Sequence, residues 1–234
     1  MKNSVIRSSL FLLSAACLLA SAAPRPIDYQ FERVRGKVVL SSPSGEVRAQ
    51  PGTEARNGDR VRTGWMGYAV LGARGHAATF EIFSYSDVLL ASGAPGAILS
   101  RERGRIKAIF DKISGDEPRA VKTPGALLAV RGTRYGVEVG RDGQATLAVF
   151  EGAVEVISPL RPQPLVVRAG EICQFGRAHA PVSMPMPHGM NEHNWNQHGT
   201  GGSMRDGGNP MDGSMGGHGS TGGHSGNGSS GRRH

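Results

Sequence analysis

Histidine and methionine side chains are concentrated at the C-terminal end of this 234-residue chain. Imidazole nitrogen is a ligand of Cu, Ni and Zn, and thioether sulfur selects Cu(I). The candidate ligands are His188, His193, His198, Met184, Met186 and Met190. Their spacing matches no structural zinc site. The residues therefore predict weak uptake of Cu or Ni at most, and no resident cofactor.

Motifs of known catalytic sites are absent from the sequence. It contains no H-E-x-x-H, G-x-S-x-G or P-loop motif, and outside the C-terminal region the histidines are His76 and His179. Cys173 has no sign of a neighbouring base that would activate its thiol. Its alternation with its neighbours predicts a small buried side chain that shares a side with Phe175. We therefore expect a protein that is not an enzyme.

The most regular stretch of the chain lies between residues 121 and 156. Alternate residues from 133 to 139 fall on one side of an extended chain, and the same period resumes at residues 145–149 after an Asp142-Gly143 turn. This pattern predicts a β-hairpin with one buried face. Arg131-Gly132-Thr133 opens its first strand, and Glu151-Gly152 interrupts the second.

This stretch resembles the FecR domain, which is named for a bacterial regulator of ferric citrate uptake. The hairpin carries the family's Arg-Gly-Thr and Glu-Gly strings, and flanking strings match in family order over roughly residues 34–176. The motif residues, which the resemblance marks as structural or binding, are Gly58, Asp59, Thr63, Gly64, Arg131, Gly132, Thr133, Glu151, Gly152, Gly170 and Glu171.

The resemblance implies a function in binding. Full regulators of the family carry a cytoplasmic anti-sigma segment, one transmembrane helix and then this domain in the periplasm. The chain is similar to a stand-alone exported FecR domain without the first two parts. The leading hypothesis is a cell-envelope binding or signalling module that recognises a protein or a surface polymer. Two alternatives are a periplasmic protein that handles Cu or Ni through its tail, and a structural surface component.

The N-terminus has the features of a targeting segment. Lys2 and Arg7 precede an apolar stretch at residues 10–20, and Ala20-Ser21-Ala22 supplies a cleavage site. A stretch of about eleven apolar residues is shorter than the ~20 that span a bilayer, so we expect no transmembrane segment in the mature chain. A lipoprotein signal ending at Cys17 and an uncleaved anchor are the other interpretations. Export to the periplasm or the cell exterior follows.

Composition divides the chain into three regions. We expect a signal peptide at residues 1–22, a FecR-like β-domain at 23–180 and a disordered tail rich in Gly, Ser, His and Met at 181–234. Turn signals recur at roughly ten-residue spacing within the domain. The predicted fold class is all-β, as a sandwich or a short solenoid of many short strands.

Positive charge predicts where a partner would bind. The formal net charge is +8, and alternation along a strand would place Arg101, Arg103, Arg105 and Lys107 on one face. Such a face is either an ordinary solvated surface or a binding surface for an acidic protein or an anionic envelope polymer. Nucleic acid is disfavoured by export and by the shortage of aromatic residues among the basic ones.

Overall fold

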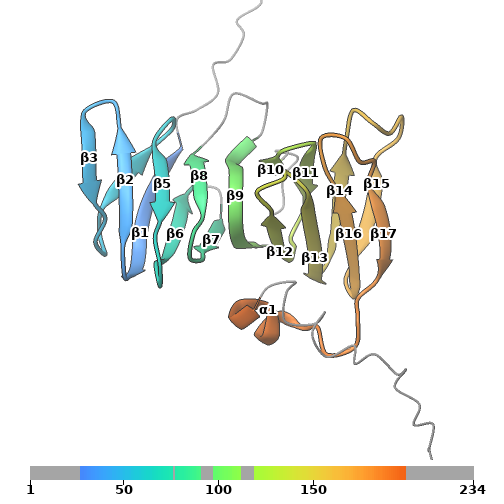
Figure 1. The fold of residues 1–234 in the computed structure, drawn as a ribbon. Helices are drawn as coiled ribbons and strands as arrows, with labels where there is room; N and C mark the ends of the chain where they lie inside the picture. Colours follow the sequence, from blue (N-terminus) through green and yellow to red (C-terminus); the bar gives the residue numbers. More distant parts are fainter. Residues whose placement is uncertain (1–26, 76, 91–96, 112–118, 199–234) are drawn as a thin grey trace, which may run out of the picture.

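The protein is an all-β sandwich with one short helix (Figure 1). The computed structural model describes residues 27–75, 77–90, 97–111 and 119–198. Over these residues the chain forms two sheets that share one hydrophobic core. The predicted fold class is therefore confirmed. The expected signal peptide and residues 199–234 lie outside the described ranges, and the expectations for them stay predictions.

In both sheets the strands run from the N-terminal part of the chain at one side to the C-terminal part at the other. The molecule is therefore elongated across its strands (Figure 1). The first sheet has the order β4-β1-β6-β7-β9-β12-β13-β16-β17. The second has the order β3-β2-β5-β8-β9-β10-β11-β14-β15. Within the described ranges every pairing is antiparallel except that of β9 with β10.

The elements of the first sheet are β1 (Asp28–Arg35), β4 (Glu54–Arg56), β6 (Tyr68–Arg74), β7 (Ala78–Ile82), β12 (Arg134–Val139), β13 (Ala145–Glu151), β16 (Glu171–Phe175) and β17 (Val182–Pro185). Those of the second are β2 (Val38–Ser42), β3 (Gly45–Arg48), β5 (Arg60–Thr63), β8 (Asp87–Leu90), β10 (Arg119–Thr123), β11 (Ala126–Val130), β14 (Ala153–Ile157) and β15 (Leu165–Arg168). Strand β9 (Ala97–Phe110) belongs to both sheets, and α1 (Glu192–His198) follows β17.

Strand β9 passes from one sheet to the other. Its first part pairs with β8 and β10 in the second sheet, and residues 104–110 pair with β7 and β12 in the first. Gly104 stands at the change with a φ of 100°, and a side chain there would overlap Ser86. The register also shifts at this point, because Arg103 pairs with Asp87 while Arg101 pairs with Val88.

The core lies between the sheets and follows the predicted alternation. In the hairpin formed by β12 and β13, Tyr135 pairs with Val149 and Val137 pairs with Leu147, and all four side chains are buried. The predicted β-hairpin with one buried face is confirmed. Cys173 is buried in the same core, as its place in the sequence predicted, and burial raises the pKa of its thiol to about 11.

The ordered domain extends past the boundary expected at residue 180. Residues 182–185 form β17 beside β16, and α1 packs on the outer face of the first sheet. Trp195 of α1 is fully buried, in a cluster with Ala148, Ile172 and Met190. A methyl group at Gly136 would overlap its indole ring. One aromatic side chain thus buries enough apolar surface to hold a segment that has no periodic apolar face.

No helix within the described ranges is both long and apolar enough to cross a membrane.

Candidate functional site

The motif residues lie where the chain passes from one sheet to the other. Gly58-Asp59 precedes β5, and Thr63-Gly64 lies at its end. Arg131-Gly132-Thr133 joins β11 to β12, Glu151-Gly152 lies between β13 and β14, and Gly170-Glu171 lies between β15 and β16. Each string therefore occupies a corner of the sandwich, and one pair of strands separates each of the last three strings from the next.

Polar motif side chains at these corners bond to nearby backbone. The carboxylate of Asp59 accepts a hydrogen bond from the backbone N of Arg56 at 2.9 Å. The hydroxyl of Thr63 donates to the carbonyl of Phe83 at 2.6 Å. The Glu171 carboxylate accepts from the backbone N of Arg168 at 2.8 Å. Satisfied buried backbone groups stabilise a turn, so the geometry of these three residues is that of scaffold.

The corner that contains Arg131-Gly132-Thr133 brings two segments of backbone into close contact. Gly132 and Gly152 have φ values of 63° and 77°, in the left-handed region that favours glycine. A Cβ atom on Gly152 would lie 2.8 Å from both the carbonyl oxygen of Gly132 and the Cγ2 of Thr133. The Arg-Gly-Thr and Glu-Gly strings therefore pack against each other, although eighteen residues lie between Gly132 and Glu151.

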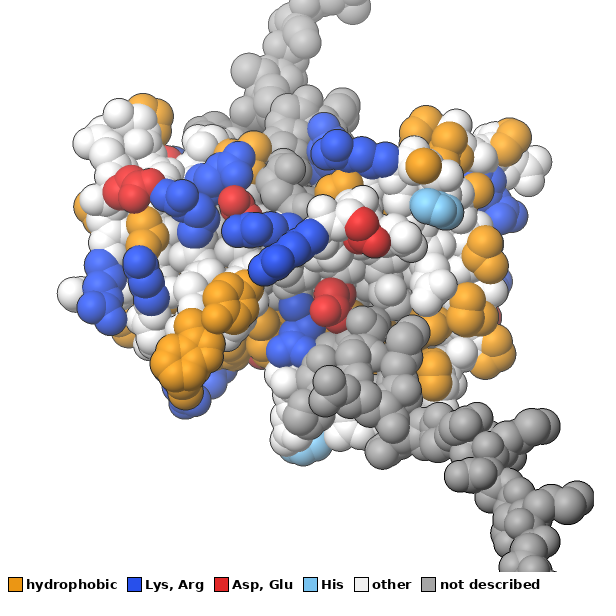
Figure 2. All heavy atoms as spheres, in the orientation of Figure 1, with side chains coloured by type: hydrophobic (Ala, Val, Ile, Leu, Met, Phe, Trp, Pro, Cys, Tyr) orange, Lys and Arg blue, Asp and Glu red, His pale blue; other side chains and the backbone are white. Residues whose placement is uncertain are grey.

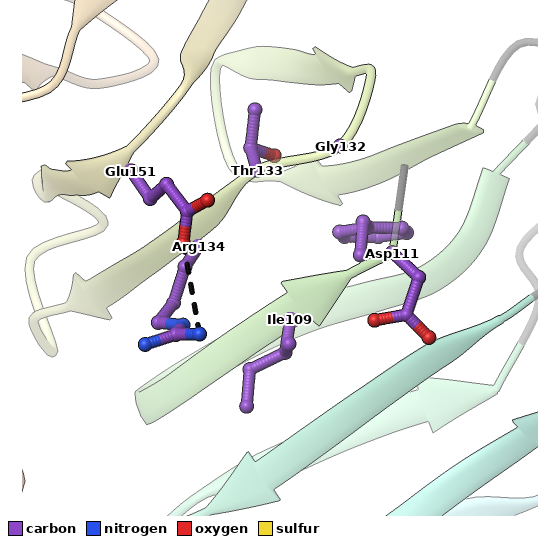
Figure 3. Close-up of a pocket in the computed structure, with 7 residues that line it drawn as sticks. Ile109, Asp111, Gly132, Thr133, Arg134 and Glu151 are labelled. Carbon is purple, nitrogen blue, oxygen red and sulfur yellow. Dashed lines mark ion pairs between the residues drawn. The ribbon is translucent and has the colours of Figure 1, made fainter. Parts of the chain in front are cut away.

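A pocket of about 230 Å³ opens beside this corner. It is lined by Ile109, Phe110, Asp111, Gly132, Thr133, Arg134 and Glu151. Figure 3 shows Arg134 and Glu151 together on one side and Asp111 on the other. Arg134 Nη2 lies 3.6 Å from the Glu151 carboxylate. Within the described structure, the Oγ1 of Thr133 and the Nε of Arg134 are buried without a hydrogen-bond partner.

A chain of ion pairs continues from the pocket to α1. Arg134 Nη1 lies 3.3 Å from the carboxylate of Glu192, the first residue of the helix. The same carboxylate lies 3.1 Å from Lys107 Nζ, which is 2.5 Å from the carboxylate of Glu81. Burial alone would raise the pKa of Glu192, but the hydrogen bonds and charges of Lys107 and Arg134 outweigh it and lower that pKa. Glu192 therefore holds α1 in place as a carboxylate.

The expected basic surface on β9 is not formed as a single open face. Lys107 is only 6% exposed and is ion-paired on both sides. The guanidinium of Arg105 lies 4.5 Å from the ring centre of Phe83 and donates to the carbonyl of Asn196 in α1 at 3.3 Å. Arg103 is exposed, whereas the side chain of Arg101 is outside the described part. The physical reasons are the register shift in β9 and the helix that covers its end.

Of the candidate metal ligands that the structure describes, some pack in a buried cluster and the others are exposed to solvent. Met190 is buried and Met186 packs against the same cluster, so neither presents an open thioether. His188 and Met184 are exposed, and the ring of His193 is 2.9 Å from the side-chain amide of Gln197. No three His, Cys, Asp or Glu side chains in the described ranges stand close enough to hold a metal ion. The side chain of His198 is not described.

Three residues of the site could not be singled out from the sequence. Arg134 directly follows the Arg-Gly-Thr string, and this adjacency is the one feature of the sequence that points to it. Asp111 and Glu192 reach the site through the path of β9 and the docking of α1, which leave no local pattern. Gly132 and Gly152, the motif glycines of the corner beside the pocket, were identified from the sequence, and the close contact of the two segments shows why they are glycine.

Comparison with known proteins finds a family model that matches the part of the chain containing this corner. Residues 79–155 match the family model described as FecR protein. The match runs from β7 into β14 and contains all seven residues that line the pocket. The predicted resemblance to the FecR family is confirmed over this range. No curated protein matches the chain.

Two crystal structures of a candidate anti-sigma factor from Parabacteroides distasonis, at 2.50 and 1.65 Å resolution, are similar to this chain. Each matches with 14% sequence identity and a TM-score of 0.45. The similarity covers 54% of this chain and 59% of each of those chains. The present chain thus spans less than two thirds of their length.

Proposed function

Because residues 79–155 carry a FecR domain, we propose that the chain is a non-enzymatic signalling module that acts by binding a partner protein. The site of binding is the pocket beside the Arg131-Gly132-Thr133 corner. The N-terminal leader expected from the sequence supports an activity in the periplasm or outside the cell.

The observation that carries the proposal is a pair of unsatisfied polar atoms on two residues that line the pocket. Thr133 Oγ1 and Arg134 Nε are buried there without a hydrogen-bond partner among the described residues. A buried polar group without a partner lowers stability by about 1–3 kcal/mol. Both groups are hydrogen-bond donors, so a carbonyl or carboxylate oxygen from a partner that reached either atom would satisfy it. The Glu151 carboxylate stands beside them and can accept a hydrogen bond from a peptide N–H.

The size of the pocket favours a protein partner over a small molecule. Ligand pockets for small molecules usually hold about 300–1,000 Å³, and this one is about 230 Å³. Such a volume accommodates one side chain or one peptide group. Anchoring side chains that fill small pockets supply much of the affinity of protein interfaces. A partner that inserts one residue here therefore fits both the volume and the polar atoms.

The lining of the pocket supports binding rather than catalysis. It contains no Cys or His, and the Thr133 hydroxyl has no base bonded to it. A nucleophile needs such a base within hydrogen-bond reach. A polymeric anion is also a poorer fit than a protein, because Lys107 and Arg105 are engaged by Glu81, Glu192, Phe83 and Asn196.

Site-specific photocrosslinking in producing cells tests this proposal. A photoreactive phenylalanine at Ile109, in the pocket wall, should capture one discrete protein. The same group at Ile157, which is 40% exposed on β14, serves as the control position. We expect the captured band from position 109 and not from position 157.

A second variant separates binding from folding. Arg134→Lys keeps a positive charge for Glu151 and Glu192 but removes the Nε donor. We expect it to unfold at nearly the parent's temperature and to lose most of the capture at position 109. Undiminished capture by Arg134→Lys, or equal capture from positions 109 and 157, would contradict the proposed site.

A further inference from the structure

Three large apolar side chains stand exposed at one end of the sandwich. Trp65 is 73% exposed, Met66 66% and Tyr85 61%. Trp65 and Met66 lie in the turn between β5 and β6, and Tyr85 lies in the turn between β7 and β8. Figure 2 shows hydrophobic side chains gathered at the lower left, below the ends of these strands in Figure 1. We call Trp65, Met66 and Tyr85 the apolar tip.

The two turns that carry the apolar tip are bonded to each other. The backbone N of Tyr85 donates to the carbonyl of Gly64 at 3.4 Å, and the hydroxyl of Ser84 donates to the carbonyl of Gly67 at 3.1 Å. Gly67 N also donates to the Gly64 carbonyl at 3.0 Å. The three apolar side chains therefore form one preorganised group and need no rearrangement to act together.

Folding does not explain why large residues occupy these positions. Met66 and Tyr85 have φ values of 52° and 56°, in the left-handed region where glycine is the stable choice. Their exposed side chains recover little packing energy in return. Residues that hold an unfavourable backbone conformation without support from packing are concentrated at functional sites. The tip therefore has the character of a contact surface.

Basic residues lie beside the apolar tip. The turn between β1 and β2 packs against it, because a side chain at Gly36 would overlap the carbonyl of Met66. This turn carries Arg35 and Lys37, and Arg48 Nη2 donates to the Gly36 carbonyl at 3.3 Å. All three basic residues are exposed, and none forms an ion pair with another described residue. We call Arg35, Lys37 and Arg48 the basic collar.

We propose that the apolar tip and basic collar dock on the surface of an anionic phospholipid bilayer. Trp and Tyr favour the interface between water and lipid, where the ring enters and the polar group stays at the headgroups. Lysine and arginine beside them are attracted to anionic headgroups. The three apolar side chains stand on two narrow turns, a shape that suits insertion into the deformable surface of a bilayer. A protein interface needs roughly 800 Å² of matched surface on each partner, which this tip does not offer.

The fluorescence of Trp65 can report contact of the apolar tip with lipid, because the other tryptophan of the chain, Trp195, is buried. The full chain is mixed with vesicles of phosphatidylcholine alone or with one third phosphatidylglycerol. Its apolar residues 10–20 could themselves bind lipid, so the readout is Trp65 and not total binding. We expect a blue shift of its emission and quenching by brominated lipid with the anionic vesicles, both weaker at high salt. A Trp65→Phe variant should lose both signals.

Two sets of variants test the tip and the collar. Met66→Gly with Tyr85→Gly removes apolar surface at positions where glycine is preferred, so the protein should stay folded while Trp65 partitioning falls roughly tenfold or more. Arg35→Glu with Lys37→Glu should abolish the preference for anionic vesicles. Leu160→Ala with Val182→Ala, at exposed apolar positions of the other end, is the control and should change nothing.

Three results would overturn the proposal. The first is Trp65 emission that is the same in buffer and in anionic vesicles. The second is Met66→Gly with Tyr85→Gly variants whose Trp65 partitions as strongly as the parent's. Crosslinking of a group at position 65 to an acidic protein, with no quenching by lipid, would likewise replace the bilayer with a protein partner. The pocket variant Arg134→Lys should leave all of these lipid signals unchanged, so the two proposals fail separately.

Discussion

Gly152 and Gly132 show how a single hydrogen atom in place of a side chain permits a corner of the sandwich. Gly152→Ala places a methyl group 2.8 Å from the Gly132 carbonyl oxygen, in addition to the strain of its positive φ. Gly143→Ala is a matched control, because Gly143 has a φ of 78° but nothing within 4 Å of its Cβ position. We expect Gly143→Ala to cost about 1 kcal/mol and Gly152→Ala about 1–3 kcal/mol more. Urea unfolding of both variants measures the difference, and equal costs would remove the close approach as the reason for this glycine.

Lys107 and Arg103 stand four residues apart on β9 and have opposite environments. The side chain of Lys107 is 6% exposed between Glu81 and Glu192, while Arg103 is exposed. Lys107→Glu would bury a third carboxylate beside two others, and breaking a buried ion pair costs about 3–5 kcal/mol. Arg103→Glu should change the free energy of unfolding by less than about 0.5 kcal/mol. Chemical unfolding of the two variants checks this, and a tolerated Lys107→Glu would mean that the ion pairs around Lys107 do not support the fold.

The attachment of α1 should depend on pH through Glu192. The folded pKa of Glu192 is lowered, so its contribution to stability is complete above its unfolded pKa of about 4.3 and is lost as pH falls through the folded value. Trp195 fluorescence should therefore report release of the helix at acid pH. Glu192→Gln should weaken the attachment at pH 7 and flatten its dependence on pH below 5. Identical pH profiles for the parent and Glu192→Gln would assign the acid sensitivity to other carboxylates.

The elements differ in how far the sequence could predict them. The hairpin of β12 and β13 was predictable, because its alternation and its Asp142-Gly143 turn are both local. The course of strand β9 was not predictable, since nothing local shows that the chain bends at Gly104 and continues in the other sheet.

In the candidate site too, the residues that local geometry requires could be predicted from the sequence, whereas contacts between distant residues could not. The motif glycines stand out from the sequence because a tight corner demands them. The position of α1 depends on one distant contact, between Trp195 and the strand surface at Gly136. Neither residue carries a pattern by itself, and the surrounding polar sequence favoured a disordered tail. The basic residues of β9 were misplaced for the same reason, because the helix that covers them could not be expected.

At the scale of the whole molecule, the sandwich core and the β17–α1 segment are separable. The main core lies between the sheets, whereas Trp195 and Met190 pack outside them on Ala148 and Ile172. A chain that ends at residue 180 should therefore keep its β-sheet circular dichroism but lose stability. Loss of a buried Trp costs about 3–5 kcal/mol, so a chain that ends at 198 should unfold at clearly higher urea concentration. Trp195→Ala in the full chain should reproduce most of the loss. If ending the chain at 180 left the unfolding midpoint unchanged, α1 would be a loose attachment and the ion pairs from Lys107 to Arg134 would lose their structural role.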